Sequence, residues 1–258
     1  MSIAVSQLTN EQQSRWEFLT NRVAPRAWWA AMLGVGSVVV GGAALFVGHS
    51  DQTIHNVGDI DIWTYANTTQ LQSLIEQLGH YLPIGDIEFK TSMVIIKSVV
   101  VNVKIVRRST DHNVEQLLRS MDMDYVQCAI DRSDDQRDVV LVTTSACRDA
   151  WQTRHVHWNP AASFWRAHQS DTINGVEWAS ERIGKAELKG FCTSLQHDYS
   201  RQEECPLIRD FGSDLCCYED FRLDFDQVAS IHALTEFSPT TSINLIVPPA
   251  VPVAPAPQ

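Results

Sequence analysis

The chain has 258 residues, 44% of them hydrophobic and 20% charged, and it carries a formal net charge of −11. This composition excludes a chain dominated by disorder, and it allows one sizeable core or one core with a small helical appendage. A pI of about 5.2 argues against tight, sequence-independent binding to nucleic acid, because such binding needs a basic surface.

Six cysteines and the N-terminus indicate the compartment. The first residues lack the charged and apolar regions of a secretory leader, so we expect free thiols in a reducing, cytoplasmic setting, with association with a virus particle as an alternative. Zinc is the competing explanation for the late group of Cys192, His197, Cys205, Cys216 and Cys217. No paired C-x-x-C motif supports it, and free thiols are the prediction.

Residues 27–48 contain no charged side chain and are long enough to cross a bilayer. Arg22 and Arg26 precede the stretch, as basic residues flank many membrane spans. Five glycines interrupt it, however, and Val38-Val39-Val40 is typical of a buried strand. The prediction is therefore a globular segment with no membrane partner.

Helices and strands are predicted to alternate through the first half of the chain, from apolar spacing and from capping residues. In order they are a helix at 9–23, a short helix through Trp28 and Trp29, a strand at 38–40, a helix from Ala43, a strand at 59–63 and a helix capped by Asn67-Thr68. Strands follow at 93–96 and 99–106 around a turn at Lys97-Ser98, then a helix at 111–120 and a hairpin of 125–130 with 139–143.

After residue 146 the pattern becomes helical. Candidate helices are residues 164–168, 175–191 and 221–234, and the tail from residue 238 is rich in proline, which favours an extended or disordered segment. The predicted organisation is a core with an N-terminal helix at 1–145, a helical region at 146–237 and the proline-rich tail at 238–258. The fold class is α+β, with a mixed sheet of five to seven strands flanked by helices and a helical C-terminal half.

Two aspartates and a glycine pair carry the chemical signal. Asp59 and Asp61 alternate on a predicted strand, so both carboxylates point to one face, about 7 Å apart along the chain. Such a pair suits magnesium or manganese, which take hard oxygen ligands and leave positions for phosphate. Gly41-Gly42, at a predicted strand-to-helix turn, offers backbone N–H groups to a phosphate chain.

This combination resembles the nucleotidyltransferase superfamily of DNA polymerase β, in which a Gly-Gly or Gly-Ser turn precedes Asp-x-Asp on the next strand. The form Gly41-Gly42-Ala43-Ala44-Leu45 looks closest to the abortive-infection toxin branch. Residues 101–106 and 121–129, with the later run Arg182-Ile183-x-Lys185-x-x-x-Lys189-Gly190-Phe191, are similar to nucleotidyltransferase-like proteins of large viruses and fungi. The resemblance spans roughly residues 38–191.

The resemblance implies transfer of a nucleoside monophosphate from a nucleoside triphosphate to a hydroxyl of RNA, protein or a small molecule. Asp59 and Asp61 would be the catalytic, metal-binding residues, and Gly41, Gly42, Ser50 and Lys104 would bind nucleotide. Arg107 and Arg108 are further candidates for steering phosphate.

One feature departs from the family pattern. Active members usually place a third carboxylate on a later core strand, where this chain offers Asn102 and Lys104. Either Glu88, Asp122 or Asp124 supplies the third ligand, or the site is weakened. The alternative function is therefore a catalytically degenerate fold that serves as a binding or structural module, possibly in a viral particle, with the proline-rich tail as its attachment to an assembly.

Overall fold

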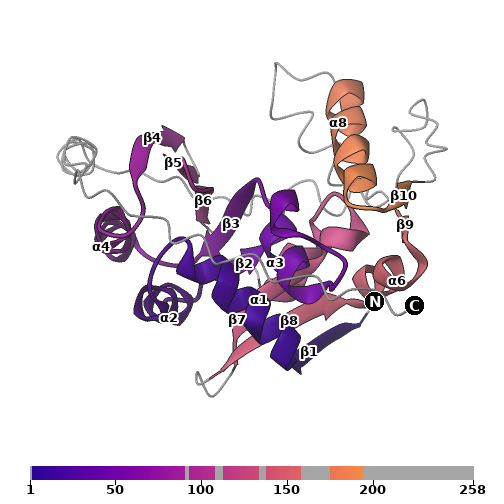
Figure 1. Cartoon of the computed structure of the whole chain (residues 1–258), viewed down its shortest axis with the longest axis horizontal. Coiled ribbons are helices and arrows are strands. Elements are labelled where there is room, and N and C mark those ends of the chain that lie inside the picture. The colour runs from indigo at the N-terminus through magenta and orange to yellow at the C-terminus, as the bar shows by residue number, and fades with distance from the viewer. Residues whose placement is uncertain (1, 91–92, 108–112, 134–137, 158–174, 194–258) are drawn as a thin grey trace, which may run out of the picture.

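An eight-stranded mixed sheet organises the structure, a computed structural model that describes residues 2–90, 93–107, 113–133, 138–157 and 175–193 (Figure 1). The strands lie in the order β1-β8-β7-β2-β3-β6-β5-β4, and β3 and β6 form the one parallel pair among them. Their bounds are β1 Ile3–Gln7, β2 Val38–Val40, β3 Asp59–Thr64, β4 Ile84–Lys90, β5 Met93–Ser98, β6 Asn102–Arg107, β7 Cys128–Arg132 and β8 Val139–Thr144. The predicted α+β class is confirmed.

Helices cover both faces of the sheet. Four of them, α1 Asn10–Asn21, α2 Arg26–Gly34, α3 Gly41–Gly48 and α4 Thr68–Gly79, pack with Ile60 and Ile62 of β3 in the larger hydrophobic core. On the opposite face, α5 Val114–Arg119 packs with Trp63 and Val106 in a smaller core. The chain also forms α6 Ser145–Thr153, α8 Gly175–Leu188, the 3-10 turns η1 Ile54–Asn56 and η2 Asp124–Val126, and a parallel ladder of β9 His155–Val156 with β10 Cys192–Thr193.

Short-range sequence patterns predicted the start of several helices correctly. Thr9 accepts a hydrogen bond from the Gln12 backbone N–H, and the Gln12 side chain returns the bond, so a capping box begins α1. Asn67 and Gln70 form the same box at α4, whose predicted stripe of Leu71, Leu74, Ile75 and Leu78 is buried. Because a cap and a stripe depend on residues three or four apart, the sequence alone reveals them.

The apolar stretch at 27–48 divides into most of α2, the whole of β2 and α3. Within the described residues, no helix has both the length and the apolar composition that a membrane crossing requires. The turn before β2 uses Gly36 at φ +76°, which explains one of the glycines that interrupt the stretch.

Several predictions about strands were wrong. The edge strands β1 and β4 were not anticipated, because an exposed edge strand such as β1 lacks the apolar alternation of a half-buried strand. The turn between β5 and β6 lies at residues 99–101 rather than at Lys97-Ser98. Valine favours strands, which is why the sequence suggested a strand from Val99, but Val99 is exposed in the turn. Residues 124–126 form η2, so β7 begins only at Cys128.

Part of the predicted C-terminal half is confirmed. The helix expected at 175–191 appears as α8, ending at Leu188. The predicted helices at 164–168 and 221–234 and the proline-rich tail lie outside the described residues. Of the proposed zinc group, only Cys192 is described; Cys128, Cys147 and Cys192 are free thiols.

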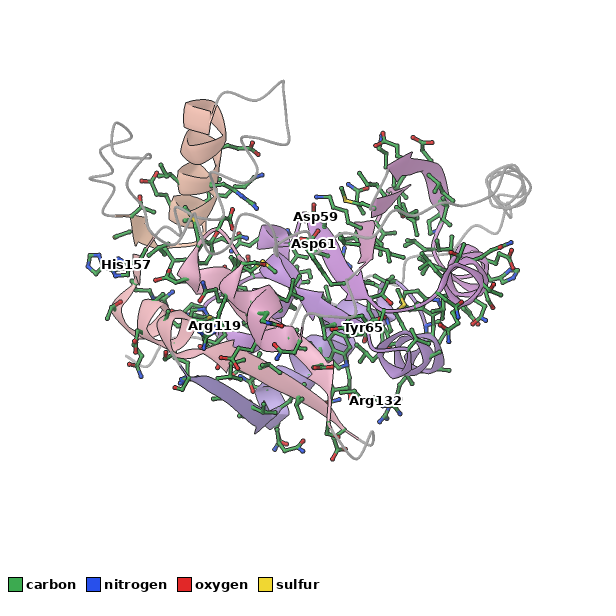
Figure 2. All side chains as sticks on the ribbon, turned by 180° about the vertical axis from the view of Figure 1, so that it is seen from behind. Asp59, Asp61, Tyr65, Arg119, Arg132 and His157 are labelled. Atoms are coloured by element: carbon green, nitrogen blue, oxygen red, sulfur yellow. The ribbon has the colours of Figure 1, made fainter. Side chains whose placement is uncertain are left out.

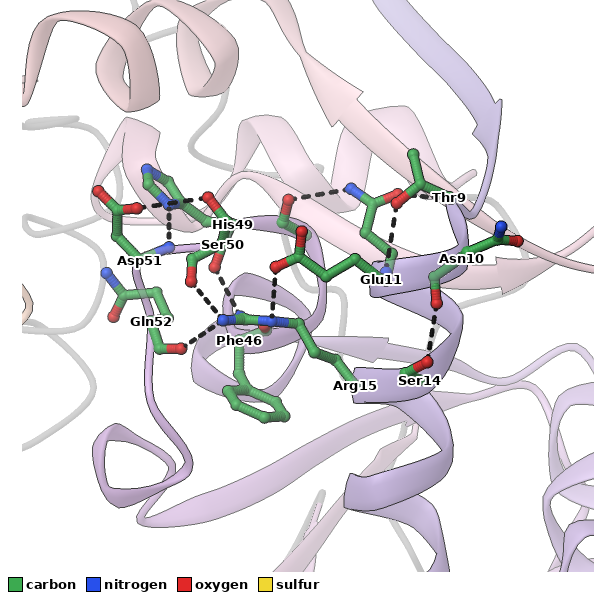
Figure 3. A network of polar contacts seen from close by, with 12 residues as sticks. Thr9, Asn10, Glu11, Ser14, Arg15, Phe46, His49, Ser50, Asp51 and Gln52 are labelled. Atoms are coloured by element: carbon green, nitrogen blue, oxygen red, sulfur yellow. Dashed lines mark hydrogen bonds and ion pairs between the residues drawn. The ribbon is translucent and has the colours of Figure 1, made fainter. Parts of the chain in front are cut away.

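The Arg15 guanidinium holds the C-terminal end of α3 against α1 (Figure 3). It donates hydrogen bonds to four backbone oxygens, those of Phe46, His49, Ser50 and Gln52. These carbonyls belong to the end of α3 and the loop after it, where helix geometry leaves acceptors without intrahelical partners. This contact fixes the start of the loop that leads from α3 into β3.

Candidate functional site

Asp59 and Asp61 lie on the α5 face of the sheet, at the beginning of β3 (Figure 2). Their neighbours Ile60 and Ile62 are fully buried on the opposite face, which forces the two aspartate side chains to the same side. Both aspartates remain partly exposed. The predicted geometry of the pair is therefore present.

The Gly41–Gly42 turn lies directly beside Asp61. Val40 of β2 pairs with Asp61 of β3, so the chain leaves β2 next to this carboxylate. Gly41 has φ +68°, and a Cβ at Gly41 would lie 3.1 Å from the Asp61 Oδ2 atom. Glycine is needed here because its backbone is left-handed and the carboxylate approaches it closely.

Lys104 is one of the two positions, with Asn102, at which the resemblance implies a third carboxylate. In the parallel ladder of β3 and β6, Asp59 is level with Asn102 and Asp61 is level with Lys104. The Lys104 Nζ atom forms an ion pair with the Asp59 Oδ2 atom. About a third of each side chain is exposed, so solvent reaches the pair. The Lys104 ammonium is thus paired with one of the two predicted metal ligands.

None of the three other acidic candidates joins Asp59 and Asp61 as a third ligand. Glu88, on the edge strand β4, pairs with Lys97. Asp122 is buried and pairs with Arg182, with 2.5 Å between Oδ2 and Nε. Asp124 is buried and accepts a hydrogen bond from the His157 backbone N–H at 3.0 Å. Asp122 and Asp124 thus lie in the bend and the 3-10 turn that precede β7, and both are buried.

Burial changes the acidity of Asp124 and the basicity of Arg182. Loss of solvent raises the pKa of Asp124 to about 6, and the His157 N–H only partly opposes this. Burial alone would lower the pKa of Arg182, but the Asp122 carboxylate, Tyr125 and Asp61 outweigh it, so the pKa is raised. Arg182 therefore stays charged and interacts electrostatically with Asp61 as well as with Asp122.

Lys189 is the residue that the site assignment from sequence missed. It is the C-cap of α8: Gly190 has φ +82° and donates to the Glu187 carbonyl, and Phe191 donates to the Ala186 carbonyl at 3.1 Å. This pattern is a Schellman motif, which the sequence Lys-Gly-Phe after an apolar helix face suggests. The motif turns the chain so that a Cβ at Gly42 would lie 3.3 Å from the Lys189 Nζ atom.

The structure does not bring Ser50 to this group. Ser50 follows the C-terminal end of α3, whereas Gly41 and Gly42 form its N-terminal end. The eight residues of α3 rise about 12 Å, so the two ends are well separated. The Ser50 hydroxyl donates to Asp51, and its carbonyl accepts from Arg15 (Figure 3). Arg107 ends β6, and Arg108 lies outside the described residues.

The donor set around Asp59 fits a divalent metal poorly. Within the described residues, no three side chains of His, Cys, Asp or Glu are grouped as metal ligands. Two carboxylates remain, and the ammonium of Lys104 already compensates one of them. A metal bound here would have to displace Lys104 from Asp59 and then lie close to its positive charge, which costs electrostatic energy.

The sequence matches no family model and no curated protein. Solved structures of similar shape include the Thermotoga maritima CCA-adding enzyme complexed with tRNA, at 14% identity and a TM-score of 0.49 over 78% of this chain and 45% of that one. A CCA-adding enzyme with ATP gives 14% identity and a TM-score of 0.48 over 75% and 43%, and a tRNA-processing enzyme with CTP gives 13% and 0.44 over 62% and 40%.

The chain thus spans less than half the length of these three proteins. None of these three proteins is a toxin or a viral protein by its name. Because the likeness is distant, the geometry of the chain's own residues must identify any ligand.

Proposed function

We propose that this protein binds the phosphates of a nucleoside triphosphate at the Gly41–Gly42 turn and does not require a divalent metal to do so. The observation that carries this proposal is the ion pair between Lys104 and Asp59. It compensates a carboxylate that would otherwise repel a polyphosphate, and it involves one of the two positions at which the resemblance implies a third metal ligand. The protein is then a nucleotide-binding module on a nucleotidyltransferase-like fold.

The surroundings of the turn support a phosphate ligand. Gly41 and Gly42 begin α3, so their backbone N–H groups lack intrahelical acceptors and are available to anionic oxygens. Lys189 lies over Gly42, and Arg182 lies near Asp61. The exposed part of Asp59 and Asp61 keeps this region open to solvent. Glycine, ammonium and guanidinium groups are the usual partners of phosphate in proteins.

The second candidate is the transfer of a nucleoside monophosphate to a hydroxyl, with magnesium or manganese held by Asp59 and Asp61. The close approach of Asp61 to Gly41 favours it, because this approach joins the carboxylate pair to the phosphate-binding turn. CTP and ATP are the ligands named for two of the structures of similar shape, so both nucleotides belong in a test of this candidate. Lys104 would first have to leave Asp59.

Titration of the full chain with each of the four ribonucleoside triphosphates separates the two candidates. Calorimetry is run in EDTA and again with magnesium, and pyrophosphate release is followed in the presence of magnesium. Binding that persists in EDTA without pyrophosphate release supports the binding module. Binding or pyrophosphate release that requires magnesium and is lost in Asp59→Asn with Asp61→Asn supports the enzyme. A folded protein that binds none of the four refutes both.

A further inference from the structure

The Lys189 ammonium is a partly buried charge without an anionic partner. Within the described part of the chain, no carboxylate or hydrogen-bond acceptor is bonded to its Nζ atom, which lies 5.9 Å from the centroid of the Tyr125 ring. An ammonium that loses water without gaining a carboxylate costs stability. By contrast, Lys104 and Arg182, the other two cations of the site, are paired with Asp59 and Asp122.

Electrostatic neighbours reinforce this contrast. Burial lowers the pKa of Lys189, and the Arg182 guanidinium lowers it further, whereas the Asp59 carboxylate acts in the opposite direction. The amine is therefore held in surroundings that do not fully compensate its charge. A polyphosphate would compensate it, because phosphate oxygens are strong, charged hydrogen-bond acceptors.

The backbone of Lys189 is held firmly in place. Its carbonyl accepts a hydrogen bond from the Gln52 Nε2 atom at 2.9 Å, and the Gln52 Oε1 atom accepts from the Asn56 side chain at 3.1 Å. Phe191, two residues further on, is buried and packs against Tyr125 with ring centroids 4.7 Å apart. The Schellman motif, the Gln52 bond and the Phe191 anchor together fix where the lysine side chain begins.

The side chain then reaches the turn that the proposed function assigns to phosphate. A Cβ at Gly42 would lie 3.3 Å from Nζ and 3.8 Å from the Asn56 carbonyl oxygen. Gly42 does not have a positive φ, so close approach to Lys189, rather than backbone conformation, is what its missing side chain permits. A ligand phosphate at the turn would thus lie within reach of this ammonium.

From this placement we infer that Lys189 is the side chain that binds the ligand's polyphosphate, delivered to the Gly41–Gly42 turn by the C-terminal end of α8. This inference rests on the proposed function, since it assigns the contact that holds the proposed ligand. It also gives α8 a role in ligand binding, although α8 lies far from the glycine turn in the sequence.

The test measures binding of inorganic tripolyphosphate and of each nucleoside triphosphate to the full chain in EDTA. Lys189→Gln removes the charge, and Lys185→Gln is the matched control, because Lys185 lies on the same helix but is exposed and paired with Glu181. We expect Lys189→Gln to weaken both ligands roughly 10- to 100-fold, the range of a charged hydrogen bond. Lys185→Gln should change affinity by no more than about twofold.

Thermal unfolding without ligand adds a second readout. Removal of an unpaired charge should leave the melting temperature of Lys189→Gln equal to or above that of the wild type, whereas loss of a structural lysine would lower it. Weaker binding with undiminished stability supports the inference. Unchanged affinity of Lys189→Gln, or a lower melting temperature of this variant, overturns the inference about Lys189. In either case, binding by the wild type still supports the proposed function. Absence of binding by the wild type overturns the proposed function itself.

Discussion

Replacement of Lys104 by aspartate should create a site with three carboxylates for a divalent metal. The side chain at position 104 is level with Asp61 in the parallel ladder, and neighbouring strands lie about 4.8 Å apart, so Lys104→Asp adds a third carboxylate beside Asp59 and Asp61. The variant also removes the ammonium that pairs with Asp59. A hard divalent cation would then meet three oxygen donors without a competing charge.

The expected loss of stability in Lys104→Asp follows from the solvent exposure of the ion pair between Lys104 and Asp59. Two unit charges about 4 Å apart interact by about 1 kcal/mol in water and about 4 kcal/mol at an effective dielectric constant of 20. Since about a third of each side chain is exposed, loss of the pair is expected to cost about 1–2 kcal/mol, and new repulsion among the carboxylates a similar amount. A total of roughly 2–4 kcal/mol should lower the melting temperature of the metal-free variant by roughly 5–15 °C.

Magnesium should restore much of that loss. At a concentration of about 100 times its Kd, a ligand stabilises the folded state by about 2.7 kcal/mol. The assay is thermal unfolding of wild type and Lys104→Asp in EDTA and in magnesium, with ionic strength matched by sodium chloride. Lys104→Asn is the control, because it removes the ammonium without adding a carboxylate.

Two results would refute this reasoning. If Lys104→Asp gains no more stability from magnesium than Lys104→Asn does, the three carboxylates do not converge as the strand register implies. If the wild type is itself strongly stabilised by magnesium, the Lys104 ammonium does not take the place of the metal.

Three further predictions test the supports of the site. Arg15→Met keeps side-chain bulk but removes the donors to four carbonyls, so the free energy of unfolding in urea should fall by roughly 2–4 kcal/mol. The exposed control Arg22→Met should change it little, and equal effects of the two variants would contradict the bridging role of Arg15. Burial raises the pKa of Asp124 to about 6 from an ordinary value of 3.8, so its stabilising contribution is present below pH 3.8 and is lost as pH rises through about 6. The loss is roughly 3 kcal/mol, and the fall of stability in a denaturation series from pH 4 to 7 should disappear in Asp124→Asn. Gly41→Ala should lower the free energy of unfolding by roughly 1–2 kcal/mol, because the backbone at Gly41 is left-handed, and it should also displace Asp61. Gly58→Ala has open space around it and should be nearly neutral, so equal stability of the two variants in urea would argue against strain at Gly41.

Residues close together in the sequence determined much of this protein. The spacing of Asp59 and Asp61 predicted two carboxylates on one face, and Gly41-Gly42 predicted the turn before α3, because both features need only the geometry of one strand and one turn. The caps at Thr9 and Asn67 follow the same logic, since a capping box joins residues three apart. The resemblance to nucleotidyltransferases also came from short runs of neighbouring residues, the glycine pair and the aspartate pair among them.

Only the tertiary structure decided how the charges of the site are compensated. Lys104 meets Asp59 through a parallel strand pairing of residues 45 apart, and Arg182 meets Asp122 from a different part of the chain. Lys189 reaches Gly42 because a Schellman motif and the buried Phe191 turn the end of α8 toward a loop far away in sequence. No periodicity encodes such contacts, because they depend on which elements pack side by side. The sequence therefore determined the aspartate pair, and packing determined that a lysine, rather than a third carboxylate, lies beside it.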